Sequence, residues 1–222
     1  DHRSNKGHPN KGINILLYRM AKLVAAFILL LFSFPCFAQH KTRTIEELIN
    51  NEEPGWPLVQ QWIDPAKNKV EILSCDLAKA KDALEKTQGT TRSPMGAIMY
   101  STGGLLIDNG WIRILGSGNK KLSRTIPDWN KGKSFKEFGG TPTFLLIADD
   151  AIGGFFAING GQFGKDAGII YYLAPGSLEW ESLDMTYSDF LLFCFNGDLS
   201  NFYTGLRWTN WIDEVSILDG DK

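Results

Sequence analysis

The sequence predicts a single α+β domain in which helices precede a mainly antiparallel sheet and further helices follow it. Three observations support this class. Segments with helix-capping residues come first, short apolar stretches separated by Gly, Asn, Asp and Pro follow, and capped helical segments return near the end. Short connections between successive strands indicate an antiparallel meander, because parallel neighbours need a long crossover. Helices gathered before and after such a sheet define the α+β class.

The composition fits one globular domain without a nucleic-acid partner. The chain has 222 residues, of which 43% are hydrophobic and 22% charged, as in ordinary folded proteins. We find no internal repeat or linker that would divide it. Its formal net charge of −2 is unlike that of proteins that grip a phosphate backbone, so we expect no nucleic-acid partner.

A signal peptide is predicted near the start. Met20–Lys22 carries a positive charge, an apolar run occupies Leu23–Phe32, and the small residue Ala38 follows, which together form the export pattern. The run is shorter than the about 20 residues needed to span a bilayer. Cys36 would suggest a lipoprotein cleavage site, but Pro35 before it does not fit that motif, so we favour cleavage after Ala38.

The chain therefore has three predicted parts. Residues 1–19 are interpreted as upstream sequence or a misplaced start, residues 20–38 as the signal peptide, and residues 39–222 as one α+β domain. We expect an exported protein, periplasmic or extracellular, that meets a membrane only through the signal peptide before cleavage. Cleavage removes Asp1 and five basic residues, so Lys plus Arg falls from 23 to 18 and Asp plus Glu from 25 to 24. The net charge becomes −6, and His40 is the one histidine that remains.

Capping residues delimit the first elements of the domain. Thr44–Glu47 fits a capping box, Asp76 can cap a helix that runs to Lys86, and Ser93-Pro94 places a proline at the first helical position. The apolar run 97–100 alone would also suit a strand, but residues typical of a helix start and a helix end flank it, and they favour a helix. We expect helices beginning near 44, over 58–63, 76–86 and 95–101, and a strand over 70–75.

A hairpin and a meander are predicted next. Asn109-Gly110 is a turn dipeptide between two apolar stretches, Leu105–Asp108 and Trp111–Leu115. Asn119–Gly140 is polar and without periodicity, so we expect a long loop there. Further strands are expected over 143–148, 154–158, 168–173 and 178–183, a helix over 186–195, and another beginning within 201–211.

Several strings resemble a bacterial family known as a domain of unknown function, DUF2625. The similarity covers most of residues 39–222. The strings that carry it are Thr90–Ala97, Gly103–Asp108, Gly110–Gly118 and Ala148–Gly161, with Tyr171–Trp180, Phe193–Asp198 and Leu206–Trp211 in the later part.

More distantly, the layout resembles the SUKH superfamily. There a helix ends in a Gly-Gly turn, a twisted antiparallel sheet carries an Asp-Asp/Gly-Gly hairpin, and a helix like Ser188–Leu191 follows. This resemblance implies a SUKH-like fold that binds, and many members are immunity proteins that neutralise a toxin. Many of those act in the cytoplasm, so the predicted export of this chain departs from them.

The residues left after cleavage argue against most enzyme chemistry. His40, close to the mature N-terminus, is an unfavourable base for a Ser-His-Asp or Cys-His site and cannot supply a histidine metal site. Gly164-Lys165 is followed by Asp166, which breaks the phosphate-loop pattern. We expect no catalytic residue, metal or cofactor, although carboxylates leave an enzyme open as the less favoured alternative.

Candidate binding residues lie in two regions. Asp149 and Asp150 precede Gly153 and Gly154, an arrangement typical of a tight turn, and otherwise suited to half of a glycosidase pair or a calcium ligand. Tryptophan and arginine are common at binding hot spots, although tryptophan more often lies in a core. We therefore add a second group, comprising Trp129 in the long loop, Arg207 and Trp208.

Two cysteines remain in the predicted mature domain. Cys75 ends a strand, and Cys194 lies in an apolar helical run. In an oxidising compartment they could form a disulfide, and a loop of this size would then add about 4–5 kcal/mol of stability. The sequence does not decide between a bridge and two free thiols.

The leading hypothesis is an exported, non-enzymatic binding domain with a protein partner, of the immunity-like kind that the SUKH resemblance implies. The alternative is a carbohydrate-binding or carbohydrate-active envelope protein that uses tryptophan and carboxylates. A structural envelope protein is the third possibility. The glycine- and aspartate-rich stretch Asp149–Gly161 and the loop that carries Trp129 are expected to form or border the binding surface.

The predicted export signal implies a specific first residue for the mature protein. We expect Gln39 to be its first residue, because signal peptidases cleave after a small residue such as Ala38. Intact-mass measurement of the protein from its native host checks this. A mass that retains residues 20–38 would contradict it.

Overall fold

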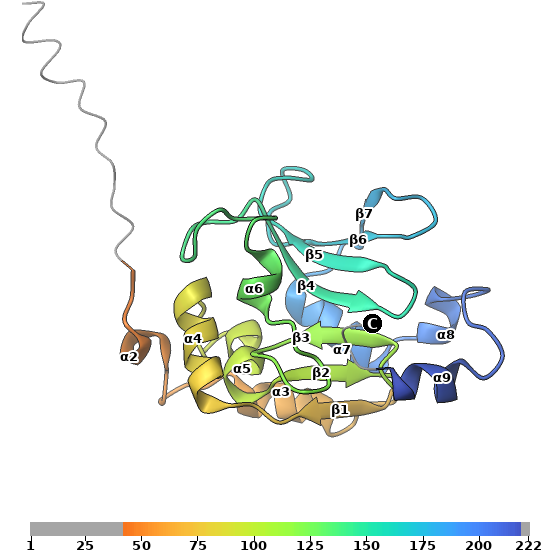
Figure 1. Ribbon diagram of the computed structural model, residues 1–222, viewed down its shortest axis with the longest axis horizontal. Coiled ribbons are helices and arrows are strands. Elements are labelled where there is room, and N and C mark those ends of the chain that lie inside the picture. The colour runs from red at the N-terminus through yellow and green to blue at the C-terminus, as the bar shows by residue number, and fades with distance from the viewer. Residues whose placement is uncertain (1–41, 219–222) are drawn as a thin grey trace, which may run out of the picture. The chain divides into compact units, whose positions relative to one another are not determined.

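The computed structural model describes residues 42–218, so the segments 1–19 and 20–38, and with them the predicted signal peptide, lie outside the described residues. Figure 1 shows the arrangement of the elements. The helices are α2 (Ile45–Leu48), α3 (Trp56–Ile63), α4 (Leu77–Thr87), α5 (Pro94–Ser101), α6 (Ile126–Asn130), α7 (Tyr187–Asn196), α8 (Leu199–Phe202) and α9 (Trp211–Ile217). The strands are β1 (Val70–Leu73), β2 (Gly104–Ile107), β3 (Ile112–Leu115), β4 (Phe144–Asp150), β5 (Phe155–Asn159), β6 (Ile170–Leu173) and β7 (Trp180–Ser182).

The strands form one seven-stranded sheet in chain order, and every neighbouring pair is antiparallel. This meander confirms the α+β class. The hairpin expected at Asn109-Gly110 is also confirmed: Asp108, Asn109 and Gly110 have φ values of 50°, 62° and 88°. Such left-handed conformations favour Asn, Asp and Gly, which is why the turn could be recognised.

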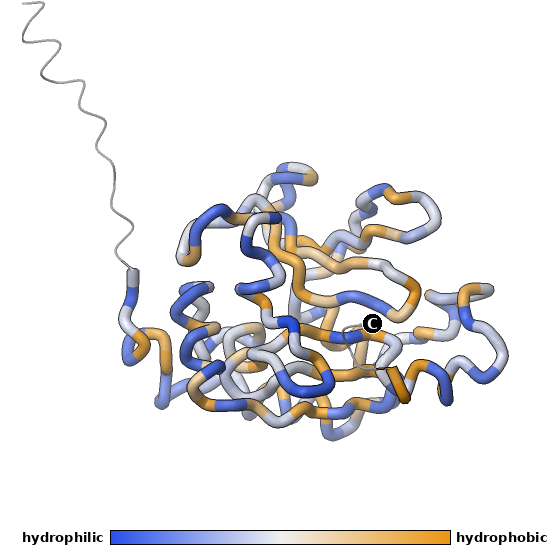
Figure 2. Tube along the Cα trace, viewed as in Figure 1, coloured by the Kyte–Doolittle hydropathy of each residue, from blue (hydrophilic) through white to orange (hydrophobic). Residues whose placement is uncertain are grey.

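One face of the sheet, which we call the inner face, packs against helices. Ile107, Ile114 and Phe156 of this face join buried side chains of α3, α5 and α7, including Val59 and Phe190. Figure 2 shows hydrophobic residues concentrated in the central strands, whereas the loops are mostly hydrophilic. The alternating pattern of the strands, in which successive side chains point to opposite faces, thus places the main core on one side.

The opposite face, which we call the outer face, is covered only in part. Leu73 and Leu115 belong to it and pack with Leu84 of α4 and Ile126 of α6 in a second buried cluster. Farther across the sheet, paired residues form a row that crosses all seven strands. This cross-sheet row consists of Glu71, Leu106, Arg113, Asp149, Phe155, Leu173 and Trp180.

The structure corrects two expectations about the chain between the strands. The stretch Asn119–Gly140 is not a plain loop, because Thr125 caps the short helix α6 by accepting a hydrogen bond from the Asp128 amide at 3.1 Å. The stretch 201–211, expected to begin a helix, lies mostly between α8, which ends at Phe202, and α9, which begins at Trp211. Between residues 42 and 218, no helix has both the length and the apolar character needed to cross a bilayer.

The disulfide that the sequence left open is not formed. Cys75 follows β1 and is exposed, whereas Cys194 lies in α7 and is fully buried in the main core. Burial raises the pKa of the Cys194 thiol well above its usual value, because a thiolate there would lose its hydration.

We therefore expect unequal reactivity of the two thiols. In the folded domain produced from Gln39 onward, a thiol reagent should label Cys75 rapidly and spare Cys194, because reaction needs an accessible thiolate. Denaturation without reductant should expose both thiols, as read by absorbance or intact mass. A denatured, unreduced chain without free thiol would instead show that a bridge forms.

Candidate functional site

Two adjacent carboxylates at the end of β4 organise the centre of the sheet. Asp149 and Asp150 are both buried, at 2% and 0% exposure. Because they are consecutive residues of a strand, their side chains point to opposite faces. Asp149 lies in the cross-sheet row of the outer face, and Asp150 pairs with Ile112 on the inner face.

Two arginines neutralise Asp149. Nε of Arg113 donates to Oδ1 of Asp149 at 2.6 Å, and Arg124, which comes from the segment between β3 and β4, contacts Oδ2. Arg113 also donates to the main-chain oxygen of Asp150 at 2.8 Å. Burial raises the pKa of Asp149, while the positive charges of Arg113 and Arg124 oppose that rise.

Asp150 is held by neutral donors. Its Oδ1 accepts main-chain hydrogen bonds from Ile152 at 3.1 Å and Gly154 at 2.7 Å, which closes the turn between β4 and β5. Its Oδ2 accepts from the hydroxyls of Tyr172 at 2.7 Å and Tyr203 at 3.1 Å. Burial and the nearby carboxylate raise the pKa of both tyrosines, so they remain protonated donors.

The two glycines of this turn are required for different reasons. Gly153 has a φ of 90° and open space around its Cα, so it is needed for conformation. A Cβ on Gly154 would lie 2.4 Å from the Tyr172 hydroxyl oxygen and 2.5 Å from Oδ2 of Asp150, so it is needed for close approach. The turn interpretation therefore holds for Asp150, Gly153 and Gly154, whereas Asp149 pairs with arginines and takes no part in closing the turn.

Trp129 connects to Asp149 through Arg124. The Arg124 guanidinium lies 4.6 Å from the centre of the Trp129 ring, the Lys133 ammonium lies 4.4 Å from it, and Phe155 of the cross-sheet row packs at 6.3 Å. Two cations thus form cation–π contacts with the Trp129 ring, which leaves less of the ring surface available for stacking against a ligand.

Arg207 and Trp208 lie beside the β2–β3 turn, around Trp111, whose main-chain oxygen accepts a hydrogen bond from the Ala151 amide just after Asp150. Arg207 forms a 2.6 Å ion pair with Asp108 and stacks 4.9 Å from the ring of Trp111. Trp208 packs on the same Trp111 ring at 5.5 Å and donates to Glu214 at 2.8 Å. The structure therefore groups Trp129 with Asp149 and places Arg207 and Trp208 in a second cluster around Trp111.

Sequence reasoning missed an aromatic cluster on the outer face, which we call the ring cluster. It consists of the half-buried rings of Phe144, Phe163, Tyr171 and Trp180. Phe163 stacks on Trp180 at 4.5 Å and contacts Phe144 at 5.4 Å and Tyr171 at 5.0 Å. The alternation of strands β4, β6 and β7 could have placed three of the rings on one face, but Phe163 belongs to a turn.

A buried amide fixes that turn. Asn159 is 1% exposed, and its oxygen accepts from the main-chain amides of Gly161 at 2.8 Å and Phe163 at 3.1 Å. Its nitrogen donates to the main-chain oxygen of Gly164 at 3.1 Å and to the Asp166 carboxylate at 2.9 Å. Asp166 also accepts from the Tyr171 hydroxyl at 2.9 Å. The position of Phe163 is therefore set by hydrogen bonds, as expected of a preorganised contact surface.

The oxygens of the two aspartates are occupied by contacts within the domain. Asp149 and Asp150 have their oxygens engaged by arginine, tyrosine and main-chain donors, so neither is placed to take a proton from a substrate. Across residues 42–218, His, Cys, Asp and Glu side chains nowhere gather in a group of three or more that could hold a metal ion.

The ion pair of Arg113 makes stability depend on pH in a defined way. Arg113→Met should lower the free energy of unfolding by about 3–5 kcal/mol near pH 8, because it leaves Asp149 with one cation fewer. The loss should be smaller near pH 5. Without Arg113 the pKa of Asp149 in the folded state rises further, so the folded variant retains a proton that the unfolded chain releases, and stability falls as pH rises. Urea unfolding at the two pH values measures this.

The double variant Arg113→Met/Asp149→Leu is the matched control. It removes both charges of the pair and should recover much of the lost stability at pH 8. An Arg113→Met loss that is equal at both pH values would contradict the assigned electrostatic role.

Comparison with known proteins finds relatives over most of the chain. The chain is 49% identical to an uncharacterized protein of Haemophilus influenzae (strain ATCC 51907 / DSM 11121 / KW20 / Rd) over 180 residues. The aligned region covers 81% of this chain and 79% of that protein. The chain is 44% identical, again over 180 residues, to the YbfG protein of Escherichia coli (strain K12), covering 81% and 82% of the two chains. No solved structure matches. The profile of the family described as "Protein of unknown function DUF2625" matches residues 45–222, and the chain belongs to this family.

Proposed function

We propose that this protein is an exported, non-enzymatic binding domain that recognises a protein partner through the outer face of its sheet. The observation that carries the proposal is the ring cluster, four half-buried aromatic side chains held together on a face that the helices leave partly uncovered. The export pattern of residues 20–38 supports the location.

The ring cluster has the chemistry of a protein contact. Aromatic residues are enriched at the centres of protein interfaces, where they bury large apolar areas at small entropic cost. Trp180 and Phe163 stack on each other, so one face of each ring is already covered. The uncovered parts of the rings suit packing against apolar side chains.

The dimensions of the outer face suit a standard interface. Neighbouring strands lie about 4.8 Å apart, so the cross-sheet row from Glu71 to Trp180 extends over roughly 29 Å. An interface that buries about 800 Å² on each partner has a similar diameter. The buried pair Arg113–Asp149 lies in the middle of the row and stiffens it.

The SUKH resemblance of the sequence is consistent with such a role, because that superfamily implies binding of proteins, including toxins. An immunity-like function is the form of the proposal that this resemblance favours. The predicted export would then place the partner outside the cytoplasm.

The proposal predicts that the ring cluster dominates affinity. Trp180→Ala and Phe163→Ala should each weaken binding of the partner by about 2 kcal/mol, roughly thirtyfold in Kd, as truncation of an interface hot spot does. The partner is first identified by cross-linking the wild-type domain in an envelope extract, then purified. Kd values are measured by calorimetry, with circular dichroism as a check on folding.

Trp62→Ala is the matched control, since Trp62 is also half-buried but packs from α3 against the main core. It should leave Kd unchanged at temperatures where the variant is folded, and Trp180→Phe should retain most of the affinity. If Trp180→Ala and Phe163→Ala bind like the wild type, the outer face is not the contact surface.

A second candidate function, carbohydrate binding, has one favourable observation. A cavity of about 260 Å³ is lined by Trp56 and Tyr100 together with polar side chains such as Asn51 and Ser101, a combination that suits a sugar ring. Quenching of tryptophan fluorescence by envelope glycans that Trp56→Ala abolishes and Trp180→Ala preserves would favour this function over the proposed one.

A further inference from the structure

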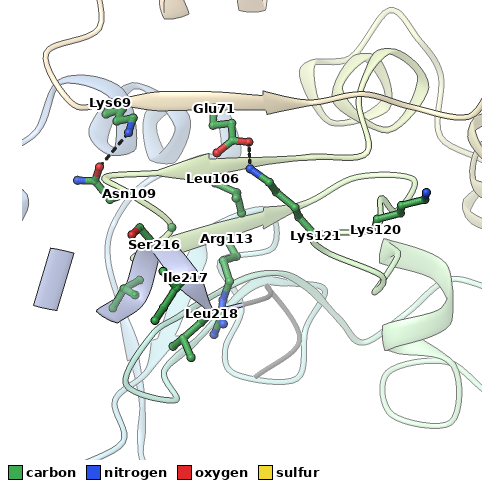
Figure 3. Close-up of a pocket in the computed structure, with 12 residues that line it drawn as sticks. Lys69, Glu71, Leu106, Asn109, Arg113, Lys120, Lys121, Ser216, Ile217 and Leu218 are labelled. Carbon is green, nitrogen blue, oxygen red and sulfur yellow. Dashed lines mark hydrogen bonds and ion pairs between the residues drawn. The ribbon is translucent and has the colours of Figure 1, made fainter. Parts of the chain in front are cut away.

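A cavity of about 260 Å³ lies at the β1 end of the cross-sheet row. Figure 3 shows Glu71, Leu106 and Arg113 side by side on the first three strands, with Lys120 and Lys121 on one side and Ser216–Leu218 on another. The cavity and the ring cluster therefore occupy opposite ends of the same outer face.

The lining of this cavity is strongly basic. Four cationic side chains, those of Lys69, Arg113, Lys120 and Lys121, line the cavity with one carboxylate, that of Glu71. Arg113 is paired with Asp149 and Lys121 with Glu71, so Lys69 and Lys120 carry the surplus positive charge. This excess contrasts with the net charge of −6 of the predicted mature domain. A local concentration of one charge on a domain of the opposite sign indicates an oppositely charged ligand.

Hydrogen bonds hold two of these cations at the walls. Lys121 pairs with Glu71 at 2.5 Å, and Lys69 donates to Asn109 at 3.1 Å. Arg113 is fixed from behind by Asp149. Lys120 is exposed and forms no ion pair or hydrogen bond with any residue in the range 42–218. The walls are therefore set in place, and one ammonium group remains available.

The remaining wall is apolar and exposed. Leu106 is half-buried on the sheet, while Ile217 and Leu218 at the end of α9 are 83% and 44% exposed. Exposed aliphatic side chains beside a cavity gain free energy when a partner covers them. The occupant therefore needs an apolar part as well as negative charge.

From this combination we infer that the cavity receives an acidic peptide segment of the protein partner, with carboxylates toward Lys120 and Lys121 and an aliphatic side chain against Leu106. The volume suits one or two side chains, since small-molecule sites enclose about 300 Å³ or more. The inference rests on the proposed function, because it specifies the chemistry of the same partner at the other end of the outer face.

The probe is a fluorescent acetylated peptide, Asp-Leu-Asp-Leu-Asp, followed by anisotropy with the domain beginning at Gln39. It should bind, weaken as salt is raised, and bind about tenfold more weakly to Lys120→Glu, because rim charges act through a screened Coulomb attraction. Lys79→Glu on α4 is the matched control: it makes the same charge change at an exposed lysine outside the cavity and should leave binding unchanged.

Four results would overturn the inference. The first is equal binding of Asn-Leu-Asn-Leu-Asn, and the second is displacement of the peptide by inorganic phosphate at equal concentration, which would indicate a site for a small anion. The third is binding only after Asp219→Asn/Asp221→Asn, which would show that the chain's own carboxylates fill the cavity. If Lys120→Glu retains full affinity for the partner while Trp180→Ala loses it, this inference fails and the proposed function stands.

Discussion

The centre of this domain depends on two adjacent buried carboxylates at the end of β4, those of Asp149 and Asp150. Because these residues are consecutive in a strand, their side chains lie on opposite faces of the sheet. Asp149 is compensated by Arg113 and Arg124, whereas Asp150 is compensated by two tyrosine hydroxyls and two main-chain amides. A buried carboxylate without these donors would lower the free energy of unfolding by several kcal/mol. Each donor group must therefore keep its position for the domain to remain stable. One dipeptide thereby ties together the segment before α6, the turn after β4 and the chain after α8.

The same constraint determines what the outer face can do. Arg113 is part of the basic cavity and is held by Asp149, and Arg124 connects that carboxylate to Trp129 and so to Phe155. The basic and aromatic ends of the face are therefore joined by packed, charged groups rather than by a loop. A surface of this kind loses little entropy when a partner docks, which favours affinity.

Much of the fold could be predicted because local signals agreed with tertiary structure. Ser93-Pro94 marked the start of α5, and Asn109-Gly110 marked the hairpin, since both depend on backbone conformations that few residues adopt. The short helix α6 was missed although Thr125, Pro127 and Asp128 form a local helix start, because its five residues are too few to show helical periodicity. Asn130 donates to the main-chain oxygen of Leu146 on β4, a contact that no local pattern reveals.

The site was harder to predict for a related reason. The aspartates and glycines at 149–154 suggested a binding site in the sequence. In the structure, hydrogen bonds and close approach at these residues stabilise the turn itself, so their density indicates a structural role. The ring cluster joins residues that are up to 36 positions apart and includes Phe163 from a turn shaped by a buried asparagine. The proposed contact surface consists of side chains that remain partly exposed once the chain has folded, and which side chains these are is known only from the assembled fold.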